Sequence, residues 1–154
     1  MRLEYINPFA EAAYEIMGTY LKDDIRISDV TLREGVTNIS GVGIVIGITG
    51  NANGNVLLDM DETVACKIAS AMTETEIFNV SPAAVNALKE LANMVSASAV
   101  TKISKIGRDL NVTPPAVVQG KSVSYQSFQN ESLLVKIDIA NIGHMDIFVA
   151  IVDN

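Results

Sequence analysis

A carboxylate and a carboxamide stand three residues apart at Glu90 and Asn93, in a stretch whose apolar residues recur at helical spacing. At roughly 100° per residue the two side chains lie about 60° apart, so both project from one side of a helix. The Asn93 amide has no proton to exchange near neutral pH, but it accepts and donates hydrogen bonds at once and could hold a water molecule in a fixed orientation. Phosphoryl transfer is catalysed largely by positioning the nucleophile, so a water held in this way could be enough. Glu90 could bind a lysine of a substrate protein and so fix where that water lies. A solvated pair without a role is the alternative, because both residue types are common on exposed helix faces.

The helix that carries this pair is predicted to run from Ser81-Pro82, a capping residue followed by proline, to about Lys105. Its apolar residues recur at helical spacing and form a stripe that faces away from the pair. This predicted stripe consists of Ala84, Val85, Leu88, Leu91, Ala92, Val95, Ala99, Ile103 and Ile106. The pair therefore points outward from a helix that is anchored by its opposite side.

The neighbours of the pair are mostly small. Asn86 lies one turn earlier, and Ala83, Ala87 and Ala97 add little side-chain bulk, so another protein could approach closely. Met94 is a flexible apolar side chain next to the pair and is expected to contact that partner, although packing in the core or in a dimer is the alternative. The sequence thus predicts a helix face presented to a partner protein.

The first half of the chain is predicted to contain a long helix, three strands and a short helix. Asn7-Pro8 is typical of a helix start, because an Asn side chain caps free N–H groups and proline suits the first helical position. The alternation of apolar and polar residues over 25–33 predicts a half-buried strand, and the turn residues 51–54 predict a hairpin. Acidic Asp61 and Glu62 favour the start of the short helix. The predicted elements are a helix over 8–21, strands over 25–33, 42–49 and 55–60, and a helix over 61–73.

The second half repeats this order, with a long helix followed by three apolar runs. The runs are a strand from 116 towards Tyr125 and a hairpin of residues 132–140 and 144–152 that is closed by 141–143. If Ser81 is aligned with Asn7, Glu90 and Asn93 correspond to Ile16 and Thr19, so only the second half keeps the polar pair. The predicted fold class is α/β (α+β): two long helices packed on a mainly antiparallel β-sheet, with duplicated halves related by a pseudo-twofold axis, in a single domain of residues 1–154.

Composition narrows the classes of partner. The 154 residues are 49% hydrophobic and 19% charged, which is enough apolar material for one packed core. The net charge of -7 argues against nucleic acid and suits a basic patch on a partner protein. One cysteine cannot form an internal disulfide, the N-terminal residues lack a signal-peptide pattern, and no apolar run reaches the ~18 residues of a membrane span. A cytoplasmic protein without a membrane segment is expected.

Three further features of the sequence are expected to have structural rather than catalytic roles. Cys66 falls on a predicted amphipathic helix and is expected to be a small buried residue. His144 stands beside a hairpin turn, with no cysteine or serine motif that it could activate. The glycines at 41, 43 and 47 fit no nucleotide-binding motif and predict close strand packing or a bulge.

The surroundings of the pair resemble a known family. The pattern Asn86-x-x-x-Glu90-x-x-Asn93 on a long helix is followed by the segment PPAVVQG over 114–120 and by paired strands. The chain resembles the CheC/CheX/FliY family of chemotaxis phosphatases along essentially its whole length, and residues 5–9 and 88–94 look most like the CheX members. Two positions depart from the family pattern, because Asn86 replaces an Asp or Ser and Pro115 comes one residue early.

This resemblance implies a phosphatase that hydrolyses the phospho-aspartate of a CheY-like response regulator. Glu90 would form a salt bridge with the regulator's active-site lysine, Asn93 would orient the attacking water, and Asn86 and Met94 would contact the substrate protein. The resemblance further implies that Mg²⁺ belongs to the regulator, that this chain binds no cofactor or metal, and that the protein is a homodimer. A non-catalytic module of the same fold, either binding a receiver domain or serving dimerisation, is the alternative.

Overall fold

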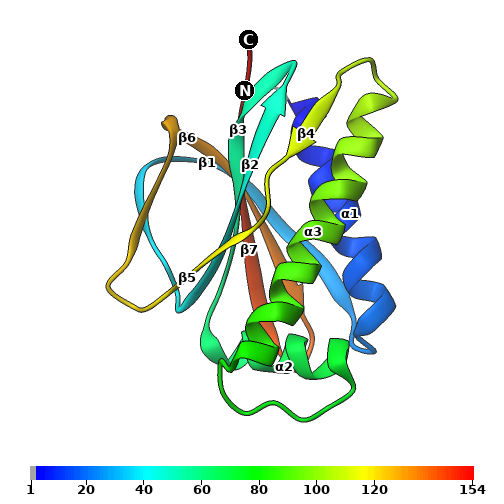
Figure 1. Ribbon diagram of the computed structural model, residues 1–154, viewed down its shortest axis with the longest axis vertical. Coiled ribbons are helices and arrows are strands. Elements are labelled where there is room, and N and C mark those ends of the chain that lie inside the picture. The colour runs from blue at the N-terminus through cyan, green and yellow to red at the C-terminus, as the bar shows by residue number, and fades with distance from the viewer. Residues whose placement is uncertain (1–2) are drawn as a thin grey trace.

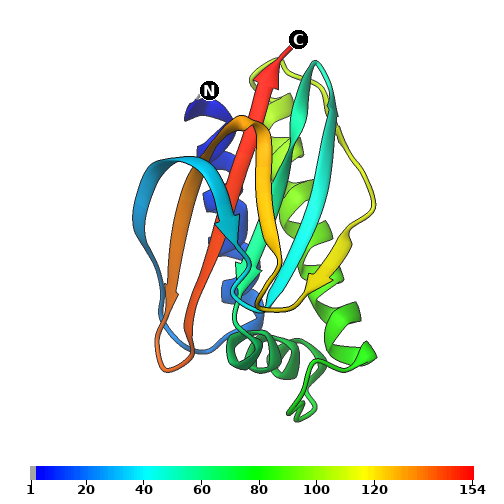
Figure 2. The same cartoon turned by 90° about the vertical axis from the view of Figure 1, so that its left-hand side faces the viewer.

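The computed structural model describes residues 3–154, and it describes all their side chains except those of residues 128–130. Met1 and Arg2, which begin the segment without a signal-peptide pattern, lie outside the described residues. Helices α1 (Leu3–Tyr20) and α3 (Pro82–Ser104) lie side by side on one face of a β-sheet, and α2 (Glu62–Thr73) lies at one end of this layer (Figure 1). Figure 2 shows the strands in front of the helices.

The sheet of the described residues has seven strands, and all their pairings are antiparallel. The strand order is β1-β6-β7-β3-β2-β4, and β5 also pairs with β2. The strands are β1 (Ile25–Asn38), β2 (Val42–Gly50), β3 (Ala52–Met60), β4 (Leu110–Val112), β5 (Ala116–Gln119), β6 (Ser124–Ile139) and β7 (Gly143–Asp153).

The strand pairing is symmetric about the contact between β3 and β7. In the first half, β2 pairs with β3 and β1 pairs with β6 of the other half; in the second half, β6 pairs with β7 and β5 pairs with β2 of the other half. Each half therefore contributes a long helix and three corresponding strands. The predicted fold class, with its duplicated halves, is confirmed.

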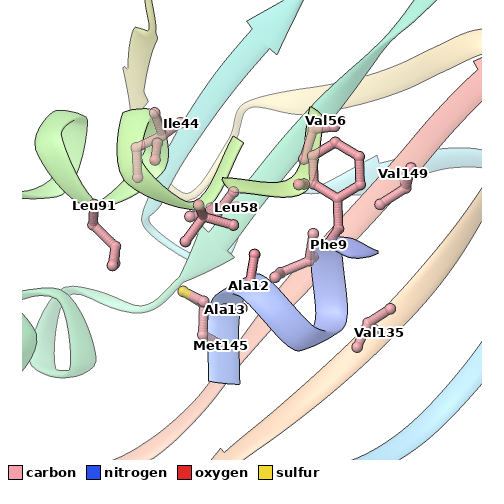
Figure 3. Close-up of a cluster of buried hydrophobic side chains, with 14 of the residues drawn as sticks. Phe9, Ala12, Ala13, Ile44, Val56, Leu58, Leu91, Val135, Met145 and Val149 are labelled. Atoms are coloured by element: carbon pink, nitrogen blue, oxygen red, sulfur yellow. The ribbon is translucent and has the colours of Figure 1, made fainter. Parts of the chain in front are cut away.

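The main core lies between the sheet and the helices α1 and α3. Figure 3 shows Phe9, Ala12 and Ala13 of α1 close to sheet residues such as Val149, with Leu91 of α3 beside them. Alternate residues of the strands point to this face, as the pleat of a β-strand requires. The strand residues in this core are Val42, Ile44, Ile46, Ile48, Ala52, Val56, Leu58, Met60, Val135, Ile137, Ile139, Met145, Ile147, Val149 and Ile151.

A smaller core lies on the opposite face of the sheet. Leu57, Leu134 and Phe148 are buried there, and Tyr125 packs against them with its ring centroid 6.5 Å from that of Phe148. The Tyr125 hydroxyl donates a hydrogen bond to Asn55, and burial raises the pKa of Tyr125 to about 12. The hydroxyl therefore stays protonated and keeps its role as donor.

Helix α1 begins earlier than its sequence signal predicts. Asn7 does not cap the helix but lies within it, and Pro8 is an internal position. Tyr5, Ile6 and Phe9 are all buried, so packing of the preceding turn against the core outweighs the local preference of Asn-Pro for a helix start. The alignment of Asn7 with Ser81 assumed that both residues begin a helix, so it does not hold.

Several strand predictions also need correction. The run from 116 to Tyr125 is not one strand, because β5 ends at Gln119 and Tyr125 belongs to β6. The strand predicted over 25–33 extends to Asn38 and is mostly exposed rather than half-buried, because β1 is an edge strand paired only with β6 in the described part of the chain. The strand β4 has only three residues, too few for their alternation to have identified it. The hairpins β2–β3 and β6–β7 are confirmed, but residues 52–54, predicted as part of the first turn, belong to β3, where they pair with β7.

Close packing explains the glycines of the sheet. A Cβ at Gly43 would lie 3.1 Å from side-chain carbons of Ile39 and Leu57, and one at Gly47 would lie 2.9 Å from a Thr113 side-chain carbon. Strand β2 continues without a register shift through both positions, so the prediction of close strand packing is confirmed.

Candidate functional site

Helix α3 is fixed at its start and along its inner face. The Ser81 hydroxyl accepts a hydrogen bond from the Ala84 N–H at 3.3 Å, and Pro82 occupies the first turn, as predicted. The prediction of an apolar stripe is wrong at two positions: Val85 is only half-buried, and Ile106 lies beyond the end of the helix and is 53% exposed. The stripe residues that are buried are Ala84, Leu88, Leu91, Ala92, Val95, Ala99 and Ile103. This stripe sets the rotation of the helix about its axis.

The rotation leaves the polar pair on the outer side. Glu90 and Asn86 are exposed, and Asn93 is half-buried at the margin of the same face. Within residues 3–154, no hydrogen bond or ion pair joins the side chain of Glu90, Asn93 or Asn86 to another residue. These polar groups are therefore available to a partner.

Two neighbours of the pair have packing partners inside the protein. Ala87 is buried with Ala69 and Ala84 between α2 and α3, so its predicted outward position is wrong. Met94 is half-buried, and its sulfur accepts a hydrogen bond from the Tyr20 hydroxyl at 3.6 Å. Met94 thus links the margin of the candidate site to the end of α1.

The other candidates do not gather around this face. Cys66 is buried on α2, and burial, with a smaller effect from Glu62, raises the pKa of its thiol, which disfavours the reactive thiolate. His144 lies on β7, where its Nδ1 is 3.3 Å from a carboxylate oxygen of Asp146. Neither Cys66 nor His144 therefore acts as an activated nucleophile or base beside Asn93.

One buried carboxylate was missed by the sequence reasoning. Asp59 is 3% exposed, and its carboxylate accepts hydrogen bonds from the Ser40 N–H at 2.9 Å and the Ser40 hydroxyl at 3.0 Å. Burial raises the pKa of Asp59, while the Ser40 hydrogen bonds act in the opposite direction. The signal in the sequence was an acidic residue inside the apolar run of β3. The role of Asp59 is to fix the turn between β1 and β2, and it does not join Glu90 and Asn93.

Among the described residues, no group of three or more His, Cys, Asp or Glu side chains is placed so that it could hold a metal ion. No helix of the described part of the chain is long and apolar enough to cross a membrane.

Solved structures share this fold over almost the whole chain. The chemotaxis protein CheX from Desulfovibrio desulfuricans has a TM-score of 0.87 at 20% identity, and the match covers 97% of this chain and 99% of that one. A CheC-like superfamily protein from Shewanella sp. PV-4 has a TM-score of 0.88 at 20% identity and covers 99% of each chain. A chain in the CheX-CheY-BeF3-Mg+2 complex from Borrelia burgdorferi has a TM-score of 0.78 at 24% identity, covering 97% of this chain and 99% of that one. The architecture is therefore that of the CheC-like and CheX proteins.

Sequence comparison gives the family. The model described as "Chemotaxis phosphatase CheX" matches residues 42–138, a segment that includes Glu90 and Asn93, and the chain belongs to this family. The chain is 31% identical over 103 residues to the CheY-P phosphatase CheX of Thermotoga maritima. That match spans 66% of this chain and 64% of the length of the relative.

Proposed function

We propose that this chain is a single-domain phosphatase that hydrolyses the phospho-aspartate of a CheY-like receiver domain. The observation that carries the proposal is the placement of Glu90 and Asn93 on one outward face of an anchored helix, both without partners among the described residues. Membership of the CheX family and the name of the Thermotoga maritima relative support the same reaction.

Each residue of the pair has a separate task. The Glu90 carboxylate binds a lysine ammonium of the receiver domain and so fixes where α3 docks. Asn93 then reaches the phosphoryl group, and its amide accepts a hydrogen bond from a water molecule and holds it in line with the bond between phosphorus and the aspartyl oxygen. Attack of this water forms a new P–O bond, breaks the old one, and releases inorganic phosphate and the free aspartate.

The remaining substrate contacts would come from Asn86 and Met94. Asn86 is exposed one turn before Glu90 and can donate and accept hydrogen bonds at the rim, whereas Met94 offers an apolar surface next to Asn93. The Mg²⁺ that neutralises the phosphoryl charge would be held by the receiver domain, and this chain would bind no cofactor or metal. The reaction would take place in the cytoplasm, where receiver domains act.

We also propose that the protein is a homodimer that forms through strand β1. Ile27, Val30 and Leu32 are 38%, 46% and 54% exposed, although they pair with β6 residues whose side chains face the main core. In the described residues β1 has β6 as its one strand neighbour, so its outer edge can pair with another strand. A second copy would satisfy this edge and cover the apolar side chains.

A non-catalytic module that binds a receiver domain is the alternative, and turnover separates it from an enzyme. In the enzyme case, a phosphorylated receiver domain in large excess over this chain should lose its phosphoryl group faster than it does alone, and the faster decay should extend to the whole excess, because each molecule of the chain acts repeatedly. A docking module would leave the decay rate at the receiver domain's own value while still forming a complex. Complex formation without any acceleration of the decay would therefore overturn the proposed reaction.

A further inference from the structure

A pocket of about 880 Å³ lies at the end of the helical layer, between α2, the end of α1 and the segment that leads into α3. Its apolar lining includes Leu21, Ala71, Ile77, Phe78 and Ile142. This volume falls within the range of ligand-binding pockets in proteins. Tyr20 also lines the pocket and donates its hydroxyl hydrogen bond to Met94, so the pocket adjoins the candidate site but does not include Glu90 or Asn93.

Phe78 is held in solvent at the mouth of this pocket. Its side chain is 85% exposed, more than any other large apolar side chain that the structure describes. The neighbouring residue is fixed, because the Ile77 N–H donates a hydrogen bond of 2.9 Å to the Ser70 hydroxyl and the Ile77 side chain packs on the cluster of Ala69, Ala84 and Ala87. An exposed aromatic ring on an anchored segment is typical of a residue that inserts into an interface.

The charged residues of the pocket favour a cation. Four carboxylates line it, whereas there are two lysines, and one of these, Lys67, already lies 3.4 Å from the Asn141 carbonyl oxygen. The acidic residues are Asp23, Glu62, Glu74 and Glu76. Glu74 and Glu76 come from the same short segment as Phe78, so the aromatic ring and negative charge are presented together.

We propose that this pocket binds a cationic amphipathic segment of another protein. An apolar side chain of that segment would enter the pocket against Phe78, and lysine or arginine side chains beside it would pair with Glu74 and Glu76. The apolar lining suits the apolar side chain of the segment, and the excess of carboxylates suits its cationic side chains. This inference does not depend on the proposed phosphatase reaction, because Glu90 and Asn93 take no part in it.

The test uses labelled helical peptides on the intact chain. Fluorescence anisotropy compares a Lys/Leu amphipathic peptide with a Glu/Leu peptide of the same pattern and with a Lys/Ser peptide that keeps the charge but lacks apolar residues. The Lys/Leu peptide should bind at least about tenfold more tightly than either of the others, and its affinity should fall as salt is added. Equal binding of the Lys/Ser peptide, or complete displacement by spermine, would overturn the proposal in favour of unspecific attraction of cations.

Variants locate the binding site. Phe78→Ser and the double variant Glu74→Gln, Glu76→Gln should each weaken binding about tenfold. Ile106→Ser removes another exposed apolar side chain, and Asp29→Asn with Glu34→Gln removes two exposed charges from β1, so these matched controls should bind as the wild type does. Nuclear magnetic resonance provides the second measurement: methyl signals of Ala71, Ile77 and Ile142 should shift on binding. Wild-type affinity of Phe78→Ser, or shifts confined to other residues, would contradict the inference.

Discussion

Glu90 and Asn93 differ in exposure although they stand one turn apart on the same helix. Glu90 is exposed and can reach a partner's surface first, whereas Asn93 is half-buried and its side chain has less room to move. This difference fits the separate tasks that we propose for the two residues, docking for Glu90 and water orientation for Asn93. It also means that the two residues should fail in different ways when they are substituted.

Glu90→Gln should weaken docking on the phosphorylated receiver domain by roughly tenfold or more, because it leaves the partner's lysine without its counter-charge. Surface plasmon resonance with a beryllofluoride-activated receiver domain measures this effect, and the loss should shrink as ionic strength rises. Asp24→Asn removes an exposed charge that lies outside α3, and it serves as the control. Equal losses for both variants would indicate that only net charge matters.

Asp59 provides a prediction on pH. Burial raises the pKa of Asp59 above 3.8, Asp146 adds to this effect, and the Ser40 hydrogen bonds and His144 oppose it. Between 3.8 and the higher pKa of the folded state, the folded protein binds more protons than the unfolded chain, so stability falls as pH rises through this window. Asp59→Asn keeps an acceptor for Ser40 and should remove this dependence. Urea unfolding at a series of pH values measures it, and parallel profiles of wild type and variant would contradict the assignment.

At the scale of elements, the buried stripe of α3 determines which residues face outward. Leu88 is fully buried, and Leu88→Ala should lower the free energy of unfolding by about 2–5 kcal/mol because it leaves a cavity. Thr101→Ala, on the exposed side of the same helix, should change it by less than about 0.5 kcal/mol. Chemical denaturation compares the two variants, and an unchanged midpoint for Leu88→Ala would contradict the helix orientation.

The sequence allowed α3 and α2 to be predicted closely because the residues at their starts and the periodicity of their apolar residues agree. Ser81 and Asp61 each accept the backbone hydrogen bond expected of a helix cap. Local signals were insufficient where long-range packing decides: Asn7 lies inside α1 because Tyr5 and Ile6 are buried in the core, and β4 exists only through its pairing with β2. The outward placement of Glu90 followed from the stripe, but the burial of Ala87 depends on α2 and could not be read from α3 alone.

At the scale of the whole molecule, duplication puts two β-strands of equivalent origin at the centre and leaves β1 at one edge. The β3–β7 contact at the centre is tight, since a Cβ at Gly54 would lie 1.8 Å from the Ala150 carbonyl oxygen. The edge, by contrast, is open. The proposed catalytic face therefore lies on the helices, and the proposed assembly surface lies on the sheet.

The assembly surface can be tested with charges on β1. Val30→Lys with Leu32→Lys should convert the proposed dimer to a monomer, because lysines on an edge strand oppose pairing with a second copy. Both side chains are about half exposed, so the fold should persist. Light scattering after size-exclusion chromatography measures the mass, with Ile106→Ser as a control for the loss of an exposed apolar residue. A monomeric wild type, or a variant that remains dimeric, would contradict dimerisation through β1.

The central claim is that Asn93 orients the attacking water. The most direct measurement is the rate at which phosphorylated CheY-like receiver domains of the source organism lose phosphate in the presence of wild type, Asn93→Ala or Thr101→Ala. Wild type and Thr101→Ala should accelerate the decay of at least one receiver domain, while Asn93→Ala should be slower by roughly 10²-fold or more although it folds and docks normally. Equal decay rates with wild type and Asn93→Ala, for every receiver domain, would contradict the account.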